Sequence, residues 1–305
     1  MSENQEQLIA KYGGILNDKN ERLSVRFRAL FSLKNLGGNG AIDQIGACFD
    51  DTSELLKHEL AYCLGQMKSA YALEVLMKVL NDHQQEPVVR HEAAEAVGAI
   101  GLPDYEAYME RLEQEDPHVE VRETAHLAHQ RIKFVRNATG KDFNSSDFGS
   151  GEFCLGVTFE VTIKLVDPTP PSDETDIGKL TELFMNKSAS LWERYRAMFA
   201  LRNLSKSNEV AVTALCKGFQ DQDSALFRHE VAFVLGQVGP AAAGAENALA
   251  KVVEDEDEHP MVRHEAIEAL GAIDTEGAVK VLRKYLDSPF RIVRERFQHF
   301  KICGL

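Results

Sequence analysis

The chain has 305 residues, of which 44% are hydrophobic, so it can bury two medium cores or one elongated core. Its 48 acidic residues outnumber 34 Lys and Arg, and the net charge of −14 disfavours nucleic acid as a partner while suiting a cationic one. The N-terminus lacks a secretory pattern, no apolar stretch could span a membrane, and five cysteines without CxxC spacing are typical of a reducing compartment. We therefore expect a cytoplasmic monomer that binds neither nucleic acid nor membrane.

A related segment recurs along the chain at intervals of 31 to 35 residues. Each copy begins with a basic residue and continues as an Ala-rich helix with apolar periodicity, usually ending near a Gly. A second helical pattern precedes each copy, and a Pro often stands where the next helix would begin. The copies cover residues 24–37, 56–67, 89–100, 121–132, 193–205, 227–238, 262–273 and 293–304.

These copies predict an all-α fold made of eight helical hairpins. One hairpin cannot bury its apolar face alone, so neighbours must stack into an α-solenoid of HEAT-like repeats. PVVRHEAAEAVGAI at 87–100 and PMVRHEAIEALGAI at 260–273 agree at 11 of 14 positions, which indicates an internal duplication of a four-repeat block. We expect two pseudo-symmetric halves, residues 1–136 and 177–305.

Residues 137–176 between these halves are rich in Gly, Ser, Asp and Pro at both ends, which predicts a linker. The middle of this stretch, FCLGVTFEVTIKLV at 153–166, alternates apolar and polar residues and is β-branched, as a strand would be. We expect a β-like insert around 151–166 and assign it no function.

The basic residue at the start of each copy has a structural interpretation. We expect it to pair with an acidic residue in a turn of the stack, such as Asp82, Asp116, Asp257 or Asp287. The eight basic residues are Arg26, Lys57, Arg90, Arg122, Arg194, Arg228, Arg263 and Arg294.

The next two residues distinguish the central repeats from the outer ones. Only the two central repeats of each half carry His-Glu there, whereas the outer repeats carry Phe-Arg, Tyr-Arg, Glu-Thr or Glu-Arg. Passive copying with the repeat is the alternative explanation, but a scaffold position tends to recur in every repeat, and buried His and Glu cost free energy unless paired or metal-bound. The four pairs are His58-Glu59, His91-Glu92, His229-Glu230 and His264-Glu265.

The spacing of these pairs predicts a metal centre. Equivalent helices of neighbouring repeats run side by side about 10 Å apart, so each half supplies two imidazoles and two carboxylates to one region. All eight side chains are candidate ligands, and a dinuclear centre results if the solenoid curls so that its halves face each other. Two His and a carboxylate form the ligand set of non-heme iron oxygenases, and similar sets hold di-iron in helical bundles.

Other metal chemistries are less favoured or remain open. The chain has no HExxH, which excludes a zinc-protease helix at the level of the motif. No cysteine joins the His-Glu pairs, which disfavours structural zinc. The ligands alone leave di-manganese or di-zinc hydrolase chemistry open.

Further residues have regular spacing to these pairs. A Gly follows seven residues after each His, at Gly65, Gly98, Gly236 and Gly271; we favour close helix packing, with room for a long, thin substrate as the alternative. Glu95 and Glu268, three residues after a Glu of the motif, could support the metal ligands, but we expect them to be solvated. The other histidines have no symmetric mates and suggest surface or packing roles: His83, His118, His126, His129, His259 and His299.

Eight HEAT-like repeats in two halves, with His-Glu confined to the central repeats, resemble the deoxyhypusine hydroxylase family. ERYRAMFALRN at 193–203, ALFRHEVAFVLGQ at 225–237 and PMVRHEAIEALGAI at 260–273 carry the resemblance, which covers nearly the whole chain. It implies a di-iron monooxygenase that uses O2 to hydroxylate the deoxyhypusine side chain of a eukaryotic translation initiation factor, completing hypusine.

The resemblance also implies individual roles. One iron would take His58, His91 and Glu92, and the other His229, His264 and Glu265. Glu59 and Glu230 would face the substrate amines as catalytic and substrate-binding groups, and Gly65 and Gly236 match positions linked to substrate access. The insert around 151–166 looks longer than the family's usual connection.

A different class of function is a non-catalytic HEAT-repeat scaffold or a bilin-lyase-like protein. Such proteins share the repeat but need no His-Glu pairs in register, so iron content would distinguish the two classes.

Overall fold

The computed structural model describes residues 3–137, 166–285, 291 and 294–295. Within these ranges every regular element is a helix and no strand occurs, which confirms the predicted all-α class. No helix in the described ranges is long and apolar enough to cross a membrane. The chain divides into two compact units, unit 1 up to residue 142 and unit 2 from residue 143.

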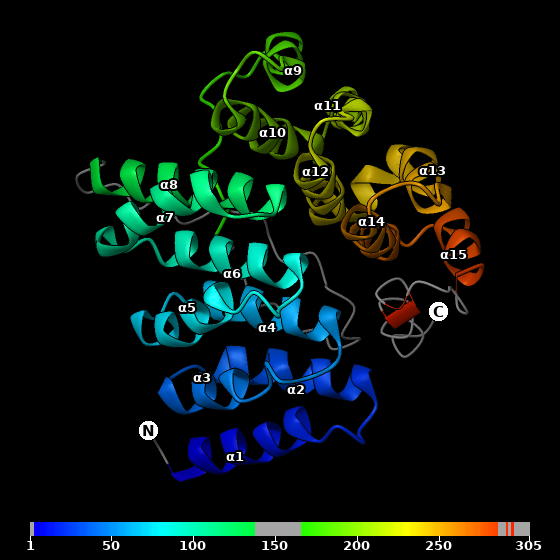
Figure 1. Cartoon of the computed structure of the whole chain (residues 1–305). Coiled ribbons are helices and arrows are strands. Elements are labelled where there is room, and N and C mark those ends of the chain that lie inside the picture. Colours follow the sequence, from blue (N-terminus) through cyan, green and yellow to red (C-terminus); the bar gives the residue numbers. More distant parts are fainter. Residues whose placement is uncertain (1–2, 138–165, 286–290, 292–293, 296–305) are drawn as a thin grey trace. The chain divides into compact units, whose positions relative to one another are not determined.

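Unit 1 is a stack of four helical hairpins that follow one another in chain order (Figure 1). The second helix of each hairpin contacts the second helix of the next, so α2, α4, α6 and α8 form one continuous row. The hairpins are α1 (Glu3–Asn17) with α2 (Leu23–Leu36), α3 (Asn39–Gly46) with α4 (Glu54–Gln66), α5 (Leu73–Asn81) with α6 (Pro87–Ile100), and α7 (Glu106–Glu115) with α8 (Val119–Asn137).

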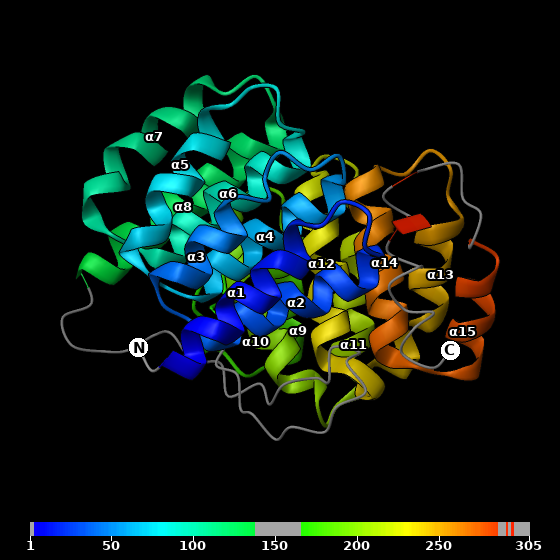
Figure 2. The ribbon, with the colours of Figure 1, turned by 90° about the horizontal axis from the view of Figure 1, so that it is seen from below.

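Unit 2 repeats this plan, with α10, α12 and α14 as its row of second helices. Figure 2 shows α13, α14 and α15 packed side by side, in agreement with their contacts. Most of the second helix of the eighth repeat, predicted at 293–304, and the strand-like segment before Val166 lie outside the described residues. The helices are α9 (Ile177–Met185) with α10 (Leu191–Ser205), α11 (Glu209–Cys216) with α12 (Ala225–Val238), α13 (Glu246–Glu254) with α14 (Pro260–Ile273), and α15 (Glu276–Arg283).

The starts of the second helices follow from their sequence. Pro87 and Pro260 are the first residues of α6 and α14, where the missing backbone N–H of proline costs no hydrogen bond. Ser190 and Glu193 form a reciprocal capping box at the start of α10. Short 3-10 helices connect several elements: Ala70–Ala72, Pro103–Tyr105, Lys217–Gln220 and Gly239–Ala245.

Glycines let neighbouring second helices approach closely. A Cβ added at Gly65 would lie 2.8 Å from the Cα of Ala96, and one at Gly98 would lie 2.8 Å from the Cα of Ala128. The contact is looser in unit 2, where a Cβ at Gly236 would lie 3.2 Å from the Cα of Ala269. Close packing therefore accounts for these glycines.

Arg26 and Arg90, in the first turn of α2 and α6, each tie three pieces of chain together. The Nε of Arg26 donates to the carbonyl of Leu16, ten residues earlier, and its Nη2 donates to Asp51 of the next turn at 2.7 Å. The Nε of Arg90 donates to the carbonyl of Leu80 in the same way, and its guanidinium holds Asp116, the predicted partner. Each guanidinium therefore caps the first helix of its own hairpin and holds the following turn.

Arg194 and Arg263 keep the same backbone contact, to Phe184 and Val253 respectively. Arg194 also donates to the buried carboxylate of Asp221 at 2.6 Å. This series of arginine contacts, here called the arginine ladder, therefore occurs in both units.

Two of the predicted acidic partners were wrong. Lys57 contacts Glu86 at 2.5 Å instead of Asp82, whose carboxylate accepts hydrogen bonds within its own turn. Arg228 contacts Glu258 at 2.6 Å instead of Asp257, which is exposed to solvent. Asp287 lies outside the described residues.

Residues 166–172, within the predicted linker, pack on α10. Asp167 accepts two hydrogen bonds of 2.7 Å from Arg202, whose side chain is fully buried. Arg196 donates to the carbonyl of Pro171 at 3.2 Å, and its own carbonyl accepts from the amide of Ser172 at 2.9 Å. This short stretch is therefore part of the first repeat of unit 2.

Candidate metal centre

The four His-Glu pairs lie in the first half of α4, α6, α12 and α14. All eight side chains are buried, and none is more than 6% exposed. Ionisable groups in such a position cost free energy unless they meet a partner of opposite charge or a metal. Their burial therefore distinguishes these pairs from the charged side chains that are exposed to solvent.

Packing of neighbouring second helices brings the two pairs of each unit together. Because α4 lies against α6, the imidazole rings of His58 and His91 have centroids 5.6 Å apart. Because α12 lies against α14, the rings of His229 and His264 have centroids 5.5 Å apart. The two units thus repeat one arrangement of imidazoles.

In unit 1 the carboxylates converge on His58. Its Nε2 lies 3.1 Å from Glu92 of the neighbouring helix, and its Nδ1 lies 3.7 Å from Glu59. Burial alone would lower the pKa of His58, but the carboxylates of Glu92 and Glu59 outweigh it and raise the pKa to about 10. The site therefore favours a positive charge between its carboxylates, a place that a metal cation suits.

In unit 2 three of the predicted ligands form one cluster. The Nε2 of His229 lies 3.4 Å from Glu265, and the Nδ1 of His264 lies 3.9 Å from the same carboxylate oxygen. Donor atoms of His229, His264 and Glu265 all lie within 4.8 Å of one another. Glu230, the remaining member of the two pairs, is 2% exposed.

One residue was misjudged from the sequence. Glu268, which we expected to be solvated, is only 6% exposed. Glu95, at the equivalent position in unit 1, is partly exposed, and its carboxylate lies within 4.8 Å of donor atoms of His91 and Glu92. The signal in the sequence was the spacing of four residues from each His, which puts both side chains on one helical face.

The chemistry of this donor set fits a divalent transition metal. Imidazole and carboxylate together suit iron, manganese or zinc, whereas magnesium and calcium favour oxygen ligands alone. Paired imidazoles in dry surroundings, with carboxylates beside them, are the arrangement that a metal ligand set requires. The buried clusters therefore support a metal site in each unit.

Several of the remaining histidines in the described residues have local contacts. His126 and His129 both place Nδ1 near one oxygen of Glu113, at 3.3 and 3.2 Å. His259 accepts a hydrogen bond from the amide of Met261 at the start of α14. These contacts agree with the predicted packing roles, and His299 lies outside the described residues.

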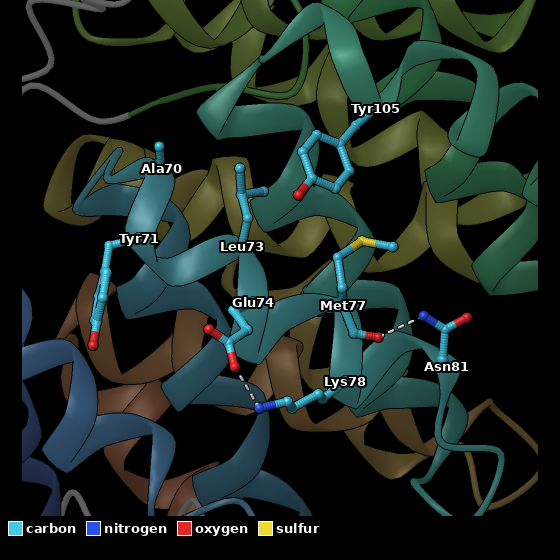
Figure 3. A pocket seen from close by; sticks show the side chains of 8 residues that line it. All are labelled: Ala70, Tyr71, Leu73, Glu74, Met77, Lys78, Asn81 and Tyr105. Atoms are coloured by element: carbon cyan, nitrogen blue, oxygen red, sulfur yellow. Dashed lines mark hydrogen bonds and ion pairs between the residues drawn. The ribbon is translucent and has the colours of Figure 1, made fainter.

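The surface pocket in Figure 3 lies elsewhere in unit 1, along α5. Leu73, Met77, Tyr71 and Tyr105 are among the residues that line it. None of the predicted site residues lines it. The pocket is therefore separate from the buried His-Glu pairs.

Comparison with known proteins agrees with the fold and the motifs. A model of HEAT repeats matches residues 42–129 and 212–299. The chain is 47% identical over 291 residues to deoxyhypusine hydroxylase of Drosophila melanogaster, covering 95% of this chain and 89% of that one. Identity to the human enzyme is also 47%, over 292 residues with the same coverage, and to the Schizosaccharomyces pombe enzyme it is 43%, over 91% of this chain and 85% of that one.

The solved structure of human deoxyhypusine hydroxylase in complex with glycerol matches with a TM-score of 0.87 at 44% identity, covering 98% of this chain and 96% of that one. The fold and the buried clusters thus define a HEAT-repeat enzyme with imidazole-carboxylate sites. Within that class, the chain belongs to the deoxyhypusine hydroxylase family.

Proposed function

We propose that the protein is a deoxyhypusine monooxygenase. It uses O2 and a non-heme di-iron centre to hydroxylate the deoxyhypusine side chain of a eukaryotic translation initiation factor, which completes hypusine. Membership in the family carries the proposal, and the burial of all eight side chains of the His-Glu pairs supports it.

The proposed ligand sets are the two that the resemblance implied. His58, His91 and Glu92 hold one iron, supported by the contact between His58 and Glu92. Iron in such sites supplies the activation of O2, and the protein supplies its ligands and a dry environment.

The second proposed set consists of His229, His264 and Glu265, supported by the cluster that these three residues form. A di-iron centre requires that the ligand set of unit 1 and the ligand set of unit 2 lie next to each other. This part of the proposal therefore requires the two units to face each other.

The other two carboxylates would hold the substrate. Deoxyhypusine is a long amine, cationic at neutral pH, and Glu59 and Glu230 offer buried negative charge to its ammonium groups. Fixing the chain at its amines brings the carbon to be hydroxylated to a defined place, which is catalysis by positioning. Gly65 and Gly236 have no side chain beside this region, which agrees with substrate access as a second role for these glycines.

The protein partner and the location follow from the same reasoning. The partner carries deoxyhypusine, and the net charge of −14 favours a cationic surface around it. Cys48, Cys63 and Cys216 are free thiols, as a cytoplasmic location would require. We propose that the protein acts there as a monomer, which light scattering coupled to gel filtration would check.

The decisive experiment incubates the purified, iron-loaded protein with the deoxyhypusine-bearing factor and O2. Mass spectrometry should find one oxygen atom added to the modified lysine, and 18O2 should label that atom. Incubation without O2 is the control. A protein that binds no iron, or a factor that gains no oxygen, would refute the proposal and favour the scaffold alternative.

A further inference from the structure

A third carboxylate accompanies one His-Glu pair in each unit. Glu95 lies four residues after His91 on α6, and Glu268 lies four residues after His264 on α14. Residues at this spacing are neighbours on one helical face. The carboxylate occurs in HEAAE at 91–95 and HEAIE at 264–268, and an aromatic residue replaces it in HELAY at 58–62 and HEVAF at 229–233.

The structure places one of these carboxylates at a cluster and buries the other. Donor atoms of Glu95, His91 and Glu92 lie within 4.8 Å of one another. Glu268 is 6% exposed, so it lies inside unit 2 on the same helix as His264. The proximity of Glu95 to His91 and the shared spacing of four residues therefore point to one role for both carboxylates.

The carboxylates of the His-Glu pairs also contact the imidazole of the neighbouring helix. Glu92 lies 3.1 Å from the Nε2 of His58, on the neighbouring helix. Glu265 lies 3.4 Å from the Nε2 of His229 and 3.9 Å from the Nδ1 of His264. Glu95 and Glu268 are further carboxylates, each one helical turn after His91 or His264 on the same helical face.

His91 and His264 are fully buried, so bulk water does not reach their rings. An imidazole that binds a metal through one nitrogen carries a proton on the other. That N–H is almost always given to a carboxylate, a carbonyl or a water, which fixes the orientation of the ring and makes it a stronger ligand. A carboxylate one helical turn away suits this task.

We propose that Glu95 and Glu268 are positioning residues for His91 and His264. With metal bound, each carboxylate accepts the N–H of the ring nitrogen that faces away from the ion. The inference rests on the proposed function, because it takes both histidines as metal ligands. In this role Glu95 and Glu268 orient the metal-binding imidazoles and do not contact the substrate.

The test is a titration of the metal-free protein with cobalt(II), read by its visible absorption. Glu95→Ala and Glu268→Ala should each weaken cobalt binding about 10- to 100-fold and alter the spectrum of the bound ion. Glu95→Gln should restore part of the affinity, because the amide oxygen still accepts a hydrogen bond. Glu110→Ala removes an exposed carboxylate from α7 and is the matched control, which should bind as the wild type does.

Far-ultraviolet circular dichroism of each variant verifies that the helices persist. Unchanged cobalt affinity and spectrum in both alanine variants would overturn the inference. This holds even if the variants have a higher KM for the substrate, because such a rise would indicate a role in substrate binding. The hydroxylation assay on the wild type is independent of this titration. Its failure would refute the proposed function, whereas failure of the titration alone would remove only the role of Glu95 and Glu268.

Discussion

At the scale of single residues, each His-Glu pair combines a local and a neighbouring contact. His58 meets Glu59 of its own helix and Glu92 of the next, so a substitution in one repeat disturbs the donor set of its neighbour. Glu265 likewise lies near both His229 and His264. The donor sets are consequently properties of repeat pairs.

His58→Ala and His264→Ala should each lose bound iron while keeping helical content. Removing a donor weakens the metal site, whereas the rest of α4 and α14 continues to pack through apolar side chains. Metal analysis by mass spectrometry and circular dichroism measure the two effects. His126→Ala is the matched control, because His126 contacts Glu113 away from the pairs and should retain full iron. Retention of both iron and activity in the first two variants would contradict the ligand assignment.

The His-Glu pairs could be found from the sequence because they recur in a fixed frame behind a basic residue. The burial of Glu268 could not, because Glu at that helical position is solvated or buried according to what the next helix places over it. The partners of Lys57 and Arg228 show a similar limit. A shift of a few residues within a turn decides which acid is reached, and the spacing of repeats does not resolve such a shift.

At the scale of helices, the separation of neighbouring second helices is set by glycine. The sequence predicted close packing at these positions, and the distances from Gly65 to Ala96 and from Gly98 to Ala128 agree with it. The same closeness brings His58 and His91 together, so the packing of α4 on α6 and the geometry of the site are coupled.

Gly65→Ala should destabilise the protein more than Gly236→Ala. The new methyl group would lie 2.8 Å from the backbone of Ala96 in the first case and 3.2 Å from that of Ala269 in the second. Overpacking of this kind costs about 1–3 kcal/mol, against a gain of about 1 kcal/mol in helix propensity. Urea unfolding of both variants measures the difference, and an equal or reversed order would contradict the packing explanation.

Residues 166–172 pack on a helix although their composition is typical of a linker. Their Pro-rich sequence is typical of a linker, yet Thr169 is fully buried and Asp167 is held by Arg202. The residues that hold this stretch are on α10, some 25 to 35 positions further along the chain. Such a contact leaves no periodic signal, so only the tertiary structure reveals it.

At the scale of the whole molecule, the repeated architecture and the site motifs could be predicted because the internal duplication makes both of them occur twice in the sequence. The match between 87–100 and 260–273 makes the frame of each half visible. The proposed meeting of the two donor sets does not follow from any local sequence pattern, because the path of a repeat array depends on the accumulated rotation from repeat to repeat. The dinuclear centre therefore stays a proposal.

Buried ion pairs should make the stability of the fold depend on acid. Burial alone would raise the pKa values of Asp51, Asp116 and Asp221, but hydrogen bonds from arginine and backbone amides lower them below the ordinary value of 3.8. A carboxyl group whose pKa is lower in the folded state stabilises the fold above the ordinary pKa, and this stabilisation is lost as the pH falls through the lower, folded value.

The free energy of unfolding should therefore hold near neutral pH and fall from about pH 4 downward. Urea unfolding at a series of pH values, followed by circular dichroism, measures this. Asp116→Asn should be less stable at neutral pH and should flatten the acid-dependent part of the curve. An unchanged slope in this variant would show that the ion pair with Arg90 makes no contribution there.

The arginine ladder also gives the chain a direction. Arg26, Arg90 and Arg194 each take their acid from the turn that follows, never from the one before. Removing the repeat after such an arginine leaves a guanidinium that has lost its carboxylate and cannot release its proton, whereas removing the repeat before such an aspartate leaves a carboxyl group that can take a proton up. Truncation from the C-terminal side should therefore destabilise the remaining repeats more than truncation from the N-terminal side.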